Sequence, residues 1–204
     1  NEGSICTNGY AYDVQQVLKG RRSFYGSFTK CTSRGDAGGT GSAAYEFDEF
    51  VNVMDTDGLV STTRLVQMRI GGGVNGLHIR NQAYEGGQDG LVITGEVYPA
   101  LISSNYFESL TSVGLNLGDT AAKRNVVVDN NWYYAIDQIG ILARNMQGGK
   151  FGCGNYFGDN VPVRINMDDN VSTATVEISP FRYADNTSNL RPVFPSDKYV
   201  LGNA

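Results

Sequence analysis

Six acidic side chains on or beside short β-branched segments are the first candidates for chemistry: Asp89, Glu96, Glu108, Asp119, Asp129 and Asp137. Glycoside hydrolysis uses two carboxyl groups, ~5–5.5 Å apart in retaining enzymes and ~6.5–9.5 Å apart in inverting ones. Because paired strands lie ~4.8 Å apart, acids on neighbouring strands, or two strands apart, match these distances. We predict Asp129 and Glu108 as the catalytic pair; the alternative is that acids in turns only face solvent.

Aromatic pairs recur along the same region: Tyr106-Phe107, Trp132-Tyr133 and Tyr156-Phe157. Because successive side chains of a strand point to opposite faces, we expect the second member of each pair to stack in the core. Tyr106, Trp132 and Tyr156 then point outward, one above another, and are the predicted ligand-binding residues. Aromatic faces suit the apolar faces of sugar rings, and they also suit subunit interfaces, where Tyr and Trp are enriched.

Lyase chemistry would need a base and a cation that neutralises a uronate carboxylate. His78 is the only histidine, and Lys123-Arg124 is the only basic doublet in this region. We interpret His78 first as a hydrogen-bonded strand residue and the doublet as a loop cap.

No metal and no cofactor are predicted, because the three cysteines lack metal-ligand spacing. Cys6 and Cys31 could pair, or all three could remain reduced thiols, and the sequence leaves both readings open.

Two motifs share one period and indicate how these residues are positioned. Asparagines precede the aromatic pairs at Asn105, Asn131 and Asn155, and Asn81 extends the series backward. Glycines begin the intervening apolar segments at Gly90, Gly114 and Gly140. Both series repeat with a period of about 24 residues, which is typical of a solenoid. Each segment is a predicted strand between turns rich in Gly, Asn, Asp and Ser.

The shared period predicts an all-β chain that folds as a right-handed parallel β-helix of about five coils. Equivalent strands then pair one period apart, and asparagines stack at corners, where they tolerate left-handed backbone. An antiparallel β-sandwich is the alternative, but it does not explain two motifs with one period. We expect residues 1–60 to form an N-terminal capping segment of mixed structure, residues 61–180 the β-helix and residues 181–204 an extended C-terminal segment. A short helix is predicted over residues 12–20.

Composition excludes several classes of protein. The 204 residues include 26 glycines, 18 asparagines and only five lysines, which is untypical of a coiled coil. The net charge of −5 argues against nucleic-acid binding and, with 11% aromatic residues, against disorder. No apolar run is long enough to insert in a membrane. The first residues show no signal peptide and no initiator Met, so we expect a fragment or a processed chain.

The corner sequence Asn125-Val126-Val127-Val128-Asp129-Asn130-Asn131-Trp132-Tyr133 resembles that of right-handed β-helix proteins, which include pectate-lyase-like enzymes and bacteriophage tailspikes. Residues 190–204 are similar to the stretch that precedes a self-cleaving intramolecular chaperone in phage tail proteins. The two resemblances imply a homotrimer in the virion tail, assembled in the host cytoplasm, whose partner is a bacterial surface polysaccharide.

The expected function is therefore a tailspike or tail-fibre module that binds that polysaccharide, and the sequence leaves open whether the module also cuts it as a depolymerase, either a glycoside hydrolase or a lyase. The alternative is a non-catalytic receptor-binding or structural trimeric fibre module, in which subunit contacts bury the outward aromatics. A cellular pectate-lyase-like enzyme is the third reading.

Overall fold

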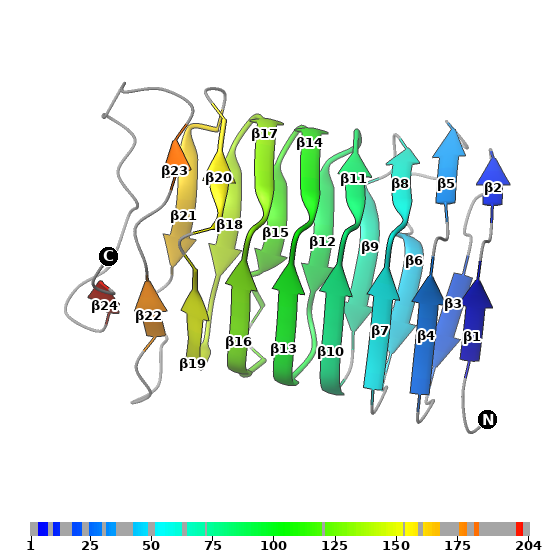
Figure 1. Cartoon of the computed structure of the whole chain (residues 1–204), viewed down its shortest axis with the longest axis horizontal. Helices are drawn as coiled ribbons and strands as arrows, with labels where there is room; N and C mark the ends of the chain where they lie inside the picture. Colours follow the sequence, from blue (N-terminus) through cyan, green and yellow to red (C-terminus); the bar gives the residue numbers. More distant parts are fainter. Residues whose placement is uncertain are drawn as a thin grey trace.

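The computed structural model shows an all-β parallel solenoid whose strands form three sheets along one axis (Figure 1). It describes residues 4–7, 10–12, 18–21, 25–29, 32–35, 43–48, 52–62, 65–71, 73–119, 121–152, 154–158, 161–167, 176–178, 182–183 and 199–201. The described residues contain no helix.

Sheet A has nine strands: β1 (Ser4–Thr7), β4 (Tyr25–Thr29), β7 (Asn52–Thr56), β10 (Val74–Arg80), β13 (Val97–Ser103), β16 (Lys123–Asp129), β19 (Met146–Phe151), β22 (Val176–Ile178) and β24 (Tyr199–Leu201). Sheet B has eight: β2 (Tyr10–Tyr12), β5 (Thr32–Gly35), β8 (Leu59–Thr62), β11 (Ala83–Glu85), β14 (Tyr106–Leu110), β17 (Trp132–Ile136), β20 (Tyr156–Phe157) and β23 (Arg182–Tyr183). Sheet C has seven: β3 (Leu18–Arg21), β6 (Ala43–Asp48), β9 (Val66–Gly71), β12 (Asp89–Ile93), β15 (Val113–Leu117), β18 (Ile139–Ala143) and β21 (Val163–Met167).

Each turn of the solenoid contributes one strand to each sheet, in the order A, B, C, and every strand pairs in parallel with its equivalent one turn away. In Figure 1 the chain advances from right to left along the axis, β10 and β11 rise on the near side, and β12 descends behind them. The chain therefore winds in a right-handed sense. Among the described residues, seven strand triplets from β1–β3 to β19–β21 each contribute one strand to every sheet, and this parallel pairing confirms the predicted parallel β-helix.

The N-terminal strands pair within the same three sheets. The predicted helix is wrong where the structure describes it, because Tyr12 ends β2 and Leu18 begins β3, which pairs with β6. Residues 13–17 lie outside the described residues. The division of the chain at residues 60 and 180 stays a prediction. The sheet continues across both positions, because β7 pairs with β10 across residue 60 and β22 pairs with β24 across residue 180.

The core contains a stack of aromatic rings contributed by sheet B. Tyr84, Phe107, Tyr133 and Phe157 are fully buried, and their successive ring centroids lie 5.0, 4.9 and 4.8 Å apart. The prediction that Phe107, Tyr133 and Phe157 point inward is therefore confirmed. Their spacing equals the separation of paired strands, so the stack follows directly from the parallel register.

A ladder of buried amides lines the corner between sheets A and B. The Nδ2 of Asn105 donates to Oδ1 of Asn131 at 2.9 Å, and the Nδ2 of Asn131 donates to Oδ1 of Asn155 at 3.1 Å. The same oxygens accept the backbone N–H groups of Asn105 and Asn131. Each amide therefore satisfies polar groups of two turns, which explains why asparagine recurs there.

The sequence pattern aligned Asn81 with this ladder, and the register corrects that alignment by one residue. Ala83 pairs with Tyr106, so Gln82 occupies the ladder position, and its N–H donates to Oδ1 of Asn105 at 3.1 Å. Asn81 is exposed and has a φ of 53°. Two roles that the prediction gave to one asparagine thus belong to neighbouring residues: one adopts left-handed backbone and the next forms the ladder.

Candidate functional site

The outer face of sheet B carries a column of aromatic side chains, Tyr106, Trp132 and Tyr156. The register pairs Tyr106 with Trp132 and Trp132 with Tyr156. The rings of Trp132 and Tyr156 lie 4.6 Å apart between centroids at an interplanar angle of 33°, and Trp132 is 52% exposed. We call these three residues the aromatic column.

Alternation along the short strands of sheet B positions the column. In β14 the side chain of Phe107 is buried in the core, so Tyr106 and Glu108 on either side of it face outward. In β17, Tyr133 is buried and the flanking Trp132 and Tyr134 are both exposed. The inner stack therefore fixes the outer column, since both belong to the same strands.

A second outward column lies two residues further along the strands and contains two carboxylates. Glu85 of β11 pairs with Glu108 of β14, and Glu108 pairs with Tyr134 of β17, which is 44% exposed. Both glutamates are half-buried. The carboxylates thus lie on adjacent turns beside the aromatic column, and we call Glu85 and Glu108 the glutamate pair.

Sequence reasoning missed Glu85 as a site residue, because the turn that joins it to Glu108 is shorter than the turns that follow. The ladder residues Gln82 and Asn105 of that turn are 23 residues apart, whereas Asn105 and Asn131 are 26 residues apart. Reading the aromatic motif back by one turn, from Phe107 to Tyr84, would have found Glu85. It follows Tyr84 in the chain as Glu108 follows Phe107.

Tyr106 and Glu108 interact across the face of β14. Partial burial, the neighbouring Glu108 carboxylate and its hydrogen bond with the Tyr106 hydroxyl raise the pKa of Tyr106 above 10.0. The phenol therefore remains a proton donor at neutral pH and holds the Glu108 carboxylate toward the aromatic column.

The register does not bring the predicted pair Asp129 and Glu108 together. Asp129 ends β16 of sheet A opposite Ser103, whereas Glu108 lies on β14 of sheet B opposite Tyr134. The Oδ1 of Asp129 accepts the N–H of Asn130 at 2.9 Å and that of Gly154 at 3.0 Å. These bonds connect two successive corners.

Three other acidic candidates also hold the solenoid together. Asp89 accepts the N–H of Val113 at 3.1 Å and the amide of Asn116 at 3.2 Å. Glu96 pairs with Arg124 at 2.8 Å, and Asp119 pairs with Lys123.

Asp137, the sixth acidic candidate, is exposed just after β17.

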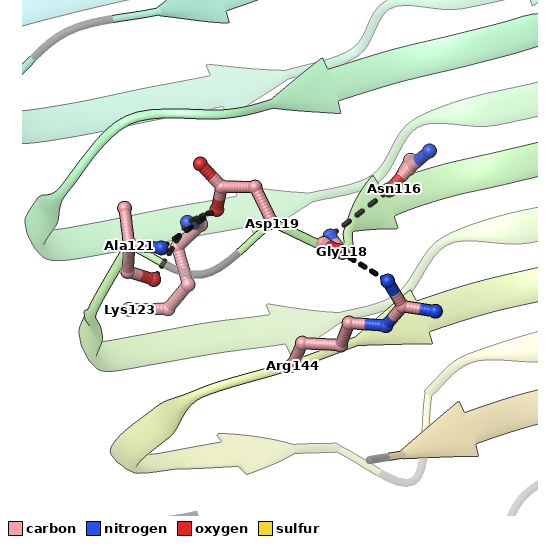
Figure 2. A network of polar contacts seen from close by, with 6 residues as sticks. All are labelled: Asn116, Gly118, Asp119, Ala121, Lys123 and Arg144. Atoms are coloured by element: carbon pink, nitrogen blue, oxygen red, sulfur yellow. Dashed lines mark hydrogen bonds and ion pairs between the residues drawn. The ribbon is translucent and has the colours of Figure 1, made fainter. Parts of the chain in front are cut away.

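The loop between β15 and β16 closes around a buried ammonium group, as Figure 2 shows. The Nζ of Lys123 donates to Asp119 and, at 2.9 Å, to the carbonyl of Ala121. Burial lowers the pKa of Lys123 below 10.5, against the opposite effect of Asp119. Arg144 donates to the carbonyl of Gly118 at 3.0 Å. The loop-cap interpretation of Lys123 is thus confirmed.

The candidate lyase residues lie on a different sheet from the aromatic column. His78 and Arg80 are exposed on β10 of sheet A, and His78 pairs with Met54 and Leu101. Lys123 and Arg124 are also in sheet A, and they pair with Asp119 of the loop before β16 and with Glu96, which precedes β13.

Among the described residues, no group of three or more His, Cys, Asp or Glu side chains could hold a metal ion. The described part of the chain also has no helix long and apolar enough to cross a membrane. Cys31 and Cys153 lie outside the described residues, so the Cys6–Cys31 disulfide stays a prediction.

Comparison of the chain with known protein families, with curated proteins and with solved structures found no match. The function is therefore inferred from the geometry of sheet B.

Proposed function

We propose that the protein binds a polysaccharide along the outer face of sheet B. The observation that carries the proposal is the half-exposed indole of Trp132, stacked with Tyr156 and aligned with Tyr106. Large exposed aromatics in a row are unusual on a surface that meets only water, and they offer apolar contact to sugar rings. The glutamate pair beside them supplies acceptors for sugar hydroxyls.

We assign this binding to a bacteriophage tailspike or tail-fibre module whose ligand is a bacterial surface polysaccharide. The support is the resemblance of residues 125–133 to the corners of tailspike β-helices and that of residues 190–204 to phage tail proteins. The same resemblance supports a homotrimer in the virion tail. Of the second segment, the structure describes only β24, which pairs with β22.

Hydrolysis of the bound polymer is a second candidate function, and the glutamate pair is the observation that favours it. Paired strands place equivalent residues ~4.8 Å apart, close to the ~5–5.5 Å between the carboxyl groups of retaining glycosidases. Glu108, one of the two predicted catalytic residues, is therefore retained in this proposal with Glu85 as its partner.

Binding is tested with the single tryptophan of the chain, Trp132, as the reporter. Titration with capsular, O-antigen and pectic polysaccharides should change its fluorescence for the polymer that binds. Calorimetry should then show that Trp132→Ala weakens affinity about tenfold, which corresponds to about 1.4 kcal/mol. Tyr98→Ala is the matched control, because Tyr98 is 49% exposed but lies on β13 of sheet A. Equal losses in both variants, or none, would contradict the proposal.

The competing structural-fibre reading requires that subunit contacts cover the aromatic column. Light scattering measures the mass of the particle against the 22.1 kDa chain, and acrylamide quenching measures access to Trp132. A trimer with quenchable Trp132 supports glycan binding, whereas a trimer that shields Trp132 supports the structural reading. New reducing ends that disappear in Glu108→Gln but persist in Asp129→Asn would support hydrolysis by the glutamate pair.

A further inference from the structure

From β11 to β20, the outer face of sheet B presents charge of one sign only, whereas the flanking strands β5 and β23 contain Arg34 and Arg182. From Ala83 to Phe157, the outward charged side chains of β11, β14, β17 and β20 are Glu85 and Glu108. The basic side chains that the structure describes, such as Lys123, Arg69 and Arg164, belong to sheets A and C or to the loops that follow them. A ligand on this face therefore meets negative charge beside the aromatic column.

The glutamate pair lacks a basic partner within the described residues. The ion pairs that the structure shows join Lys123 to Asp119, Arg124 to Glu96 and Lys150 to Glu177, all from other parts of the solenoid. Like charges directly opposite one another on paired strands repel. A cation supplied from outside would relieve this repulsion, whereas an anionic ligand would add to it.

The position of the pair relative to the aromatic column matches one sugar unit. Glu108 lies two residues from Tyr106 on β14, ~6.6–6.8 Å along the strand, which is the scale of a single sugar ring. A sugar in contact with Tyr106 can therefore direct a substituent toward Glu108, and Glu85 lies one turn from Glu108. A protonated amine is the substituent that forms charge-assisted hydrogen bonds with two carboxylates.

We propose that the glycan bound on sheet B carries free, protonated amino groups, and that Glu85 and Glu108 select it over uronate polymers. This inference rests on the proposed function, because it needs a glycan on the aromatic column. It also disfavours lyase chemistry between β11 and β20, since elimination from a uronate needs a cation beside the sugar carboxylate, and the outward charged side chains of these strands are Glu85 and Glu108.

The test uses three probes of similar length at slightly acidic pH: glucosamine oligosaccharides, N-acetylglucosamine oligosaccharides with the same linkage, and oligogalacturonate. Trp132 fluorescence and calorimetry measure the affinity of each. The free amine should bind about tenfold more tightly than its acetylated counterpart, and oligogalacturonate should bind most weakly. The preference should shrink as salt screens the charges.

Substitutions separate the charge effect from aromatic binding. Glu85→Gln with Glu108→Gln should remove the preference for the amine, so that the ratio of the affinities for the free-amine and acetylated probes falls from about tenfold to about one. Glu96→Gln is the matched control and should keep the preference, because Glu96 lies just before β13, away from sheet B, and is exposed beside Arg124. Thermal melting of all variants verifies that they are folded.

The outcomes distinguish this inference from the proposed function. Equal binding of all three probes, lost in Trp132→Ala, would overturn the amine preference and leave glycan binding in place. Tighter binding of oligogalacturonate would overturn it as well. Failure of every probe and of the wider polysaccharide panel to bind would reject both proposals together.

Discussion

Gly114 packs directly against the ring of Tyr133 in the next turn of the solenoid. A Cβ on Gly114 would lie 2.8 Å from the Cδ1 of Tyr133 and 2.7 Å from the carbonyl oxygen of Gly140. Gly90 and Gly140 make equivalent close approaches to Phe107 and Phe157. The recurring glycines Gly90, Gly114 and Gly140 therefore leave the space that the rings of the inner aromatic stack occupy.

Gly114→Ala should destabilise the protein by about 2 kcal/mol, because neither the ring nor the backbone carbonyl can move without disturbing the next turn. For a chain of this size the melting temperature should fall by ~4–8 °C. Gly73→Ala is the control, since a Cβ at Gly73 meets nothing within 4 Å. Equal melting temperatures for the two variants would show that the stack does not constrain Gly114.

Asn131→Ala should destabilise the protein by about 3 kcal/mol, measured by urea unfolding. The substitution removes the Nδ2 donor that bonds to Oδ1 of Asn155 and to the carbonyl of Ile102. It also leaves the backbone N–H and the Nδ2 of Asn105 without the Oδ1 acceptor of Asn131. Asn75→Ala, at an exposed position of β10, should change stability by less than about 0.5 kcal/mol. A loss at Asn131 no greater than at Asn75 would mean that the ladder contributes nothing.

Tyr133→Phe should stabilise the protein by about 1 kcal/mol, because the Tyr133 hydroxyl is buried and has no hydrogen-bond partner among the described residues. Its removal relieves an uncompensated desolvation cost. The ring stack with Phe107 and Phe157 is unaffected. Tyr84→Phe provides the comparison, because the Tyr84 hydroxyl donates to Sδ of Met68 at 3.6 Å and its removal should give no gain. Calorimetric melting of both variants checks the difference in sign.

Lys123 should make stability depend on alkaline pH. Because burial lowers its pKa below 10.5, the unfolded chain binds this proton more tightly than the folded protein does. The wild type should therefore gain stability relative to Lys123→Met as the pH rises through the folded-state pKa toward 10.5. Urea unfolding over that range measures the gain, and a falling difference would refute it.

Arg124→Met is the control for this pH series. It also removes one cation of the same strand, from a pair with Glu96, but a guanidinium does not titrate in this range. The stability difference between the wild type and Arg124→Met should lack the rise expected for Lys123.

The sequence by itself determined the repeat, the parallel pairing and the two faces of the aromatic strands. The recurring motifs and the strict alternation at Tyr106-Phe107 and Trp132-Tyr133 depend only on local geometry, so they could be read without coordinates. The same local signals failed over residues 12–20, where Leu18 belongs to a strand because β3 finds a partner in β6. Pairing with a distant strand overrides a weak helical pattern.

Only the tertiary structure decided which residues meet between turns. The turns differ in length: the ladder positions Gln82 and Asn105 are 23 residues apart, and the next interval, to Asn131, is 26 residues. Residue spacing alone therefore misplaces partners by one or two positions.

That difference aligned Asn81 in place of Gln82. Asp129 and Glu108 do not pair for a second reason: Asp129 precedes the corner at Asn131 and lies on sheet A, whereas Glu108 follows the corner at Asn105 and lies on sheet B, where its partner is Glu85. Neighbours across turns depend on the length of every corner, and a corner that gains a residue shifts the register of the strand that follows it.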